Sequence, residues 1–464
     1  MLQPVYRLPP ETLSSIARYV IHENDGDTRS IIPLTHVCRY WRESIIAEPG
    51  NWALVSNRSP AELTRLSLAQ CKAAPLELRL SASRFKKNPE FSTLMTPYIR
   101  NIEKLYSWKI AAIEVLAQIP PNLHQSTPNL RSLLIVGRGD WDWSTDPFGP
   151  FTPTLTHLSS AHIPLYPSFL CLGALTYLSL HYKRFDLHLD TLLDFLEENR
   201  SLEHANLAIR FGQPSLRSSS RQIVMRNRLQ VLSMSSGAAD TKALISKIAL
   251  RRGAHLGISL PGPNAGLNYA LPVTSMIHLS NLRSPTFMEY HPDNGSIRLL
   301  GPNGSFTIKS SADLENPFAE FTMLPLTNVR VFSLILLRPL GLRETSVSPI
   351  TFPPPSLSAL ETLTIECKST FDVSRLFSPL FSNPSSFPSL KILAFLDCDL
   401  DEGFMKALTR FASNRKKTAS AWLHRAVIVS SKGVLPNVAS IDALGEHVPV
   451  VNAQIGKKLP ADLI

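Results

Sequence analysis

The sequence of 464 residues predicts an α/β protein in which an N-terminal helical domain precedes an irregular solenoid of strand and helix repeats with a β-hairpin insert. Three observations support this class. Apolar residues recur at helical spacing in the first 56 residues, a Leu-x-x-Leu-x-Leu phrase then returns along most of the chain, and helical stretches separate successive phrases. Such an alternation of strands and helices stacks into a parallel sheet covered by the helices.

The first expected helix begins at Pro9 and Pro10, because proline suits the first helical turn, where a backbone N–H would have no partner. An apolar stripe at positions i, i+3, i+4 and i+7 follows, formed by Leu13, Ile16, Ala17 and Val20. The turn Asn24-Asp25-Gly26-Asp27 ends this helix.

A second helix is expected after that turn, where Asp27 or Thr28 can cap it. Its apolar positions at helical spacing are Ile31, Leu34, Cys38, Trp41 and Ile45. Two amphipathic helices should therefore pack together, with Trp41 buried among Leu13, Ile16, Leu34 and Ile45. Since a domain below roughly 60 residues is marginal by itself, a partner is expected to cover the apolar groups that remain.

Three motifs in this segment resemble an F-box: Leu8-Pro9-Pro10-Glu11, then Val37-Cys38-Arg39 with Trp41-Arg42, and a closing Pro49-x-x-Trp52. The resemblance covers about Tyr6 to Val55 and implies an F-box domain over residues 1–56. It also implies docking on the Skp-type adaptor of a cullin-RING ubiquitin ligase, while the rest of the chain holds a protein substrate. The adaptor-binding residues that the resemblance implies are Leu8, Pro9, Leu13, Ile16, Leu34, Val37, Cys38, Trp41, Ile45, Pro49 and Trp52.

One residue departs from the F-box pattern. Ala17 stands where that family usually has Phe or another large residue, which would weaken adaptor binding. The alternative interpretation of the segment is a small helical N-terminal domain with an ordinary core.

Residues 57–127 are expected to hold a helix and the first strands leading into the repeats. Ser59-Pro60-Ala61-Glu62 has the form of a capping box and predicts a helix extending toward Lys72. Leu76, Leu78 and Leu80 then alternate with polar residues, which predicts a strand with one buried face.

The repeats occupy residues 128–464. Their Leu-x-x-Leu-x-Leu phrase, with apolar substitutes, resembles irregular leucine-rich repeats, and later copies begin at Leu130, Leu155, Leu175, Leu202, Leu229, Val329, Leu360 and Leu390. Helical stretches between the phrases are expected at Asp190–Asn199, Asp240–Arg252, Phe371–Phe381 and Asp401–Arg415. The buried Asn or Cys of that family, which pairs with the backbone after each strand, is recognisable only as Cys398.

A break in the phrases falls at about residues 253–326. Within it, two alternating segments, Ile297-Arg298-Leu299-Leu300 and Phe306-Thr307-Ile308-Lys309, flank the turn Gly301-Pro302-Asn303-Gly304. This pattern predicts a β-hairpin insert.

Charge raises the question of nucleic acid, because the net charge is +10 from 47 basic and 37 acidic residues. The excess is dispersed except for a basic segment between Asp401 and Lys432. A solvated helix face is the favoured interpretation of that segment, and a phosphate or acidic-partner site is the alternative. A nucleic-acid function would rest on charge alone, so it is unlikely to be the role of this chain.

The cellular setting follows from what the sequence lacks. It has no apolar run of about 20 residues and no basic region followed by an apolar signal core, so a cytoplasmic or nuclear protein is expected, with no membrane partner. Five scattered cysteines without a C-x-x-C pair predict reduced thiols. The N-x-[ST] triplets at Asn57, Asn199, Asn294 and Asn303 are interpreted as chance turn residues.

Motifs that carry chemistry are missing as well. The Gly-Pro-Asn turns lack a following Gly-Lys-[ST], the histidines form no metal-ligand pattern, and no Gly-x-Ser-x-Gly elbow is present. The sequence therefore predicts neither an enzyme, a cofactor nor a metal site.

Substrate contacts are expected on the concave side of the sheet, where the positions between the phrase leucines point. The candidates there are Tyr177, Ser179, Val231 and Ser233, together with Trp141 and Trp143 in a loop at its rim. This surface is weakly charged and suits a protein substrate. The expected function is substrate recognition within an SCF-type cullin-RING E3 ubiquitin ligase, in the ubiquitin conjugation pathway. The alternative is a non-catalytic protein-binding scaffold whose degenerate F-box acts outside a ligase.

Overall fold

The computed structural model divides the chain into two compact units, each described here by itself. Unit 1 comprises residues 1–218 and 226–228, and unit 2 comprises residues 219–225 and 229–464. The residues that the structure describes are 8–24, 26–81, 90–110, 127–137, 154–161, 172–181, 188–211, 223–224, 228–261, 271, 279, 284–291, 295–310, 324, 326–336, 357–367, 387–417, 422–430 and 435–455.

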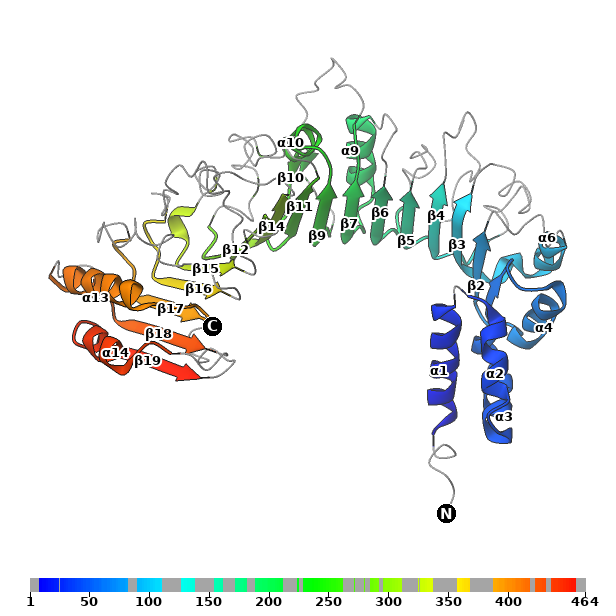
Figure 1. The fold of residues 1–464 in the computed structure, drawn as a ribbon. Coiled ribbons are helices and arrows are strands. Elements are labelled where there is room, and N and C mark those ends of the chain that lie inside the picture. Colours follow the sequence, from blue (N-terminus) through cyan, green and yellow to red (C-terminus); the bar gives the residue numbers. More distant parts are fainter. Residues whose placement is uncertain are drawn as a thin grey trace, which may run out of the picture. The chain divides into compact units, whose positions relative to one another are not determined.

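Unit 1 begins with helices that lie side by side: α1 (Pro10–Glu23), the 3-10 helix η2 (Thr28–Ile31), α2 (Ile32–Thr35) and α3 (Arg39–Ala47) (Figure 1). The start of α1 at Pro10 and the cap at Asp27, whose side chain accepts from the backbone N of Arg29, are as predicted. Our prediction of a single second helix is wrong. The helical segment is interrupted at Cys38, because the backbone of this residue is extended and its Sγ caps α3 by accepting from the backbone N of Trp41 at 3.5 Å.

These helices share a small core. Leu13, Ala17, Ile21, Ile31 and Ile45 are all almost fully buried, and Trp41 is 9% exposed, so the predicted burial of this tryptophan is confirmed.

A buried asparagine links α1 to the end of α3. Ser14 Oγ donates to Asn51 Oδ1 at 2.7 Å, and Asn51 Nδ2 donates to the Ile45 carbonyl at 3.1 Å. Trp52 Nε1 donates to the Ile46 carbonyl at 3.3 Å, which satisfies a carbonyl at the end of α3 that has no helical partner.

The helices connect directly to the sheet through β1 (Leu54–Ser56), which pairs in parallel with β2 (Leu76–Ser81). The 3-10 helix η3 (Pro49–Asn51) precedes β1, and α4 (Ala61–Cys71) joins the two strands, as predicted. The capping box does not form: Pro60 precedes α4 without a side-chain cap, and Ser59 Oγ lies 3.2 Å from Thr28 Oγ1 instead.

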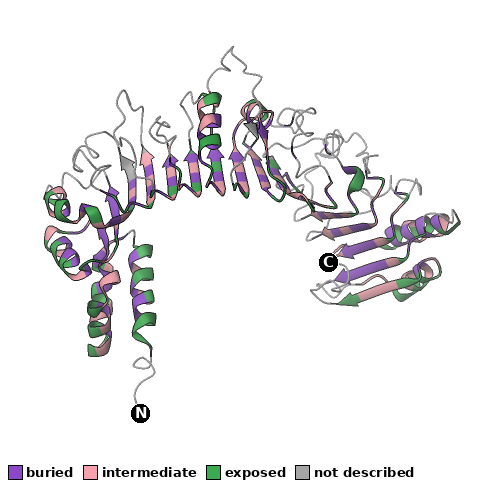
Figure 2. Ribbon diagram, turned by 180° about the vertical axis from the view of Figure 1, so that it is seen from behind, coloured by how far each residue is buried: buried purple, intermediate pink, exposed green. Residues whose placement is uncertain are grey.

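The sheet of unit 1 is parallel throughout and continues from β2 through five further strands (Figures 1 and 2). They are β3 (Ile102–Ile110), β4 (Ser132–Gly137), β5 (His157–Ala161), β6 (Tyr177–His181) and β7 (His204–Ala208). The helices α6 (Phe91–Met95), η4 (Thr96–Asn101) and α9 (Leu189–Glu198) lie between strands in the chain, and the last agrees with its predicted range. Burial alternates along β5 and β6, as the period of two required.

Unit 2 repeats this architecture with β9 (Val231–Ser235), α10 (Ala238–Ile245) and β11 (His255–Leu260), followed further along the chain by β15 (Val331–Leu336), β16 (Thr362–Cys367) and β17 (Ile392–Leu396). Helix α10 ends seven residues before the predicted Arg252, because residues 248–249 form a short strand, β10, that pairs with β8 (Ile223–Val224). A 3-10 helix, η10 (Leu326–Asn328), precedes β15.

Two further strands follow that the sequence pattern did not predict. After α13 (Glu402–Lys417) come β18 (Arg425–Ser430), α14 (Val438–Gly445) and β19 (Val450–Ile455), and both strands extend the sheet in parallel. Their phrases carry alanine and valine where leucine was sought.

The predicted hairpin is present as β13 (Ser296–Gly301) and β14 (Gly304–Ser310), but it lies within the sheet. Strand β14 pairs in parallel with β11, and β13 pairs antiparallel with both β14 and β12 (Phe287–His291), which in turn is parallel to β15. Strand β12 therefore precedes the hairpin in the chain and is not adjacent to β11. The hairpin β13–β14 then fills the space between β11 and β12. The mixed α/β class and a strand stacking compatible with a solenoid are thus present, while the predicted helix Phe371–Phe381 lies outside the described residues.

Candidate functional site

The eleven residues expected to bind an adaptor fall into two groups in the structure. Leu13, Trp41, Ile45 and Trp52 are buried by the chain itself, so their side chains hold the helices together. Pro9 and Val37 are exposed, and the half-buried members are Leu8, Ile16, Leu34, Cys38 and Pro49. A partner docking on these helices would contact this second group.

Sequence reasoning missed three exposed apolar side chains beside them: Tyr19, Ile32 and Ile46. With Val37 they make up four of the ten large apolar side chains that are exposed among the described residues. For Tyr19, a helical position opposite the buried stripe of α1 was the signal that could have identified it, whereas Ile32 and Ile46 directly follow the buried Ile31 and Ile45. We call Tyr19, Ile32, Val37 and Ile46 the apolar helix surface.

Ala17 has no part in that surface. Its side chain is fully buried in the core of the helices. The small residue therefore affects how α1 packs on its neighbours and leaves the exposed face unchanged.

The substrate candidates Tyr177 and Ser179 both point out of the sheet on β6. Tyr177 is 36% exposed and Ser179 is half-buried, whereas Leu178 and Leu180 are buried on the other side. Tyr177 lies in register between His157 on β5 and His204 on β7. The ring centroids are 5.8 Å apart for His157 and Tyr177, and 6.5 Å apart for Tyr177 and His204.

The other two candidates, Val231 and Ser233, belong to unit 2. Both are half-buried on β9, and Leu232 and Met234 between them are buried. All four strand residues thus have the predicted outward orientation, but they are divided between the two units. Trp141 and Trp143 lie outside the described residues.

Beside β9, the outward side chains include a histidine and serine pair. His255 Nδ1 lies 2.7 Å from Ser305 Oγ on the neighbouring β14. Burial lowers the pKa of His255, and the nearby charge of Arg298 lowers it further. Among the residues that the structure describes, no carboxylate is hydrogen-bonded to this histidine, so the pair is a hydrogen bond between neighbours and not a catalytic triad.

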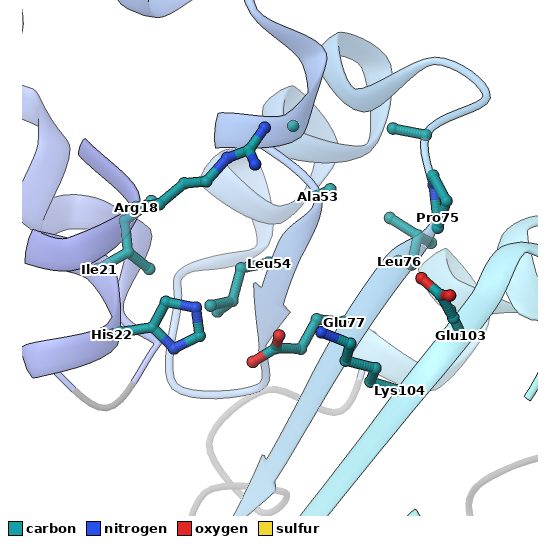
Figure 3. Close-up of a pocket in the computed structure, with 12 residues that line it drawn as sticks. Arg18, Ile21, His22, Ala53, Leu54, Pro75, Leu76, Glu77, Glu103 and Lys104 are labelled. Carbon is teal, nitrogen blue, oxygen red and sulfur yellow. The ribbon is translucent and has the colours of Figure 1, made fainter. Parts of the chain in front are cut away.

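A pocket of about 270 Å³ lies where α1 meets β1, β2 and β3 (Figure 3). Three of its charged lining groups have partners within the chain. Arg18 pairs with Glu48 at 3.4 Å, and Glu103 pairs with Arg131 at 3.7 Å. Glu77 pairs with Arg79 at 2.8 Å.

Arg79 also connects the helices to the sheet. Its guanidinium bonds to Nδ1 of His22 on α1 and lies 5.5 Å from the centre of the Tyr106 ring on β3. The pocket is consequently a joint between α1 and the first strands, and its polar groups serve the chain's own structure.

The basic segment is not a continuous basic surface. Arg415 is fully buried on α13, where its two terminal nitrogens donate to the carbonyls of Phe387 and Leu390, both at 2.9 Å. Burial lowers its pKa to about 10. Lys406 pairs with Glu402 at 2.8 Å, and Lys416 donates to the Glu446 carbonyl at 2.9 Å. Three of the seven basic side chains in this segment thus have partners within the chain.

Two side chains, the half-buried Cys398 and the buried Asn57, have the backbone-pairing role typical of residues that follow a repeat strand. Cys398 Sγ donates to the carbonyls of Ile365 and Leu396 at 3.5 and 3.4 Å, and burial raises the pKa of its thiol. Asn57 plays a comparable part at the other end of the chain, where its amide bonds to both the N–H and the carbonyl of Ser81 at 2.9 Å. Sequence reasoning missed Asn57 because no phrase precedes it.

Other chemistry can be assessed for the described part of the chain. There, four cysteines are free, and no cluster of His, Cys, Asp and Glu could hold a metal ion. Asn57 and Asn199, which open two of the N-x-[ST] triplets, are buried. Within the same residues, no helix is both long and apolar enough to cross a membrane.

In comparisons with known proteins, no protein-family model and no curated protein matches this chain.

Proposed function

We propose that the chain recognises a protein substrate for an SCF-type cullin-RING E3 ubiquitin ligase. In this proposal the N-terminal helices bind a Skp-type adaptor, and the outward face of the sheet binds the substrate. The observation that carries it is the apolar helix surface, which leaves four large apolar side chains exposed on helices that already have a buried core. Grouped exposed apolar residues commonly mark protein interfaces.

The F-box resemblance supports the identity of the partner. Its exposed motif residues flank the helices that carry Tyr19, Ile32 and Ile46: Pro9 immediately precedes α1, and Val37 lies in the turn between α2 and α3. The position of Ala17 in the core also removes one objection, because a small residue there takes nothing from the docking face.

Catalysis has no place in the proposal. A subunit that brings a substrate to a ligase needs two binding surfaces, and ubiquitin transfer belongs to other subunits.

The test uses the full chain with a Val37→Asp substitution. A charge placed in an apolar interface is costly to desolvate, so adaptor affinity should fall about tenfold or more. Val438→Asp is the matched control, because Val438 is an exposed valine on α14 in unit 2. Equal adaptor binding by the two variants would place docking elsewhere.

Co-purification separates the proposal from its alternative. Adaptor and cullin together support a ligase subunit, whereas adaptor without cullin supports a scaffold acting outside a ligase. If neither the adaptor nor the cullin co-purifies with the chain, both the ligase-subunit proposal and the scaffold alternative are contradicted.

A further inference from the structure

The outward side chains of β3 to β7 form a row across unit 1. In register they are Lys104, Ser132, His157, Tyr177 and His204, which we call the histidine-tyrosine row. We propose that this row binds an extended segment of a partner protein that carries aspartate or glutamate side chains and lies across the strands. This inference rests on the proposed function in one respect: it takes the partner protein to be the substrate of the ligase.

Geometry is the first support. The three rings stand side by side, tilted by 26° between His157 and Tyr177 and by 37° between Tyr177 and His204. An extended peptide rises about 3.3 Å per residue, so alternate side chains are about 6.6 Å apart. That repeat is close to the 5.8 and 6.5 Å that separate the ring centroids. Alternate side chains of a segment crossing the strands can therefore meet successive rings.

Ordering of the rings is the second support. Thr156 Oγ1 lies 2.8 Å from His157 Nδ1, and the neighbouring tyrosine stacks on the same ring. Rings that are already oriented lose less side-chain freedom when a ligand binds.

Charge complementarity decides the class of partner. The next outward row consists of Tyr106, Leu134, Ser159, Ser179 and Asn206. Neither row contains a carboxylate, and together the two rows offer ammonium, imidazole, hydroxyl and amide donors. Glu77 on β2, which is in register with Lys104, is already paired with Arg79 at 2.8 Å. Carboxylates supply the acceptors that such a surface lacks.

Protonation should strengthen this binding. Histidine gains positive charge between about pH 8 and pH 5, which increases its attraction for a carboxylate. The charged and titratable groups on or before the strands around His157 and His204 are Lys104, Glu103, Arg131, Tyr177, His181 and Glu203. Glu103 and Arg131 pair with each other.

The experiment uses the full chain and fluorescein-labelled peptides of alternating glutamate and alanine, with glutamine, lysine and phosphoserine counterparts. Fluorescence polarisation should show the glutamate peptide binding about tenfold more tightly than the glutamine peptide near pH 6, and a smaller difference near pH 7.5. Tyr177→Ala and His157→Ser should each weaken glutamate-peptide binding about fivefold or more. His188→Ser is the control, because His188 is exposed in unit 1 just before α9 and lies outside the row.

Equal affinity for the glutamate and glutamine peptides, including no binding of either, would overturn the inference. Preference for the lysine peptide, or unchanged binding in both row variants, would do the same. If only the phosphoserine peptide binds, the proposal of a carboxylate ligand is overturned, and the row recognises a phosphate instead. Adaptor binding is measured on the same samples, so a row that fails while the adaptor still binds refutes this inference and leaves the proposed function standing.

Discussion

At the scale of single residues, the structure assigns several conspicuous side chains to the core. Trp41 and Arg415 are the clearest examples, since one belongs to the F-box-like motif and the other to the basic segment. Both could be taken from the sequence as contacts for a partner. Their burial instead makes them determinants of stability, and exposed residues on α1 and α13 provide controls.

Replacing Trp41 with alanine should lower the free energy of unfolding by about 3 to 5 kcal/mol, the usual cost of truncating a large buried aromatic side chain. Tyr19→Ala, at a residue 65% exposed on α1, should stay within about 0.5 kcal/mol. Urea unfolding followed by circular dichroism measures both. An unchanged midpoint for Trp41→Ala would show that the packing of α3 is misassigned.

Arg415→Ala should cost about 3 kcal/mol or more, because it leaves a cavity and removes the donors to two buried carbonyls. Arg410→Ala on the exposed side of the same helix should be nearly neutral. Thermal unfolding of the two variants gives the comparison. If they unfold at the same temperature, the bonds from Arg415 to Phe387 and Leu390 contribute nothing measurable.

At the scale of elements, the hairpin β13–β14 depends on close backbone approach. A Cβ on Gly301 would lie 2.6 Å from the carbonyl oxygen of Ser284, a backbone atom that cannot easily move aside. Gly301→Ala should therefore destabilise the hairpin by about 1 to 3 kcal/mol. Gly445→Ala is the control, since a Cβ there meets no atom within 4 Å.

Hydrogen exchange is the appropriate measurement for that pair of variants, because it resolves individual strands. Faster exchange should be confined to β12, β13 and β14 in Gly301→Ala. Protection equal to that of the parent chain would mean that the backbone at Ser284 shifts without cost.

The elements that could be predicted from the sequence are those in which apolar residues follow a regular local period. Alternation identified β2, β6 and the hairpin, and helical spacing identified α9 and α13, since each period follows from local geometry. Strand β18 escaped because Ala426 stands where the phrase has leucine, and β19 escaped because none of its residues is fully buried. The place of the hairpin inside the sheet escaped for another reason: it is set by pairing with β11 and β12, which are distant along the chain, and not by any local period.

The candidate site shows the same division. Outward orientation of Tyr177 and Ser179 followed from the period of two, but the stacking of Tyr177 between two histidines required the register of three strands. On the helices, the spacing correctly assigned Leu13, Ala17, Ile31, Trp41 and Ile45 to the core, whereas the other predicted members of the stripes are only half-buried. The exposed residues Tyr19, Ile32 and Ile46 were not predicted because the motif draws attention to the residues that build the core.

At the scale of the whole molecule, the N-terminal helices are part of unit 1 and not a separate domain. Strand β1 pairs with β2 from Leu54 to Ser56, Asn57 bonds to Ser81, and His22 bonds to Arg79. These contacts reach across the loop at Lys72. Cutting there would leave β1 without its partner strand and Asn57 without its bonds.

A fragment ending at Lys72 should therefore fail to fold cooperatively, whereas residues 1–228, which retain β1 to β7, should unfold in a single transition. The longer fragment keeps the apolar helix surface on a folded support, so it should bind the adaptor with an affinity close to that of the full chain. Circular dichroism during urea titration measures the folding, and calorimetry measures the binding. Cooperative unfolding of the shorter fragment, with full adaptor affinity, would mean that the bonds from β1, Asn57 and His22 to β2 are dispensable and that the helices form a domain of their own.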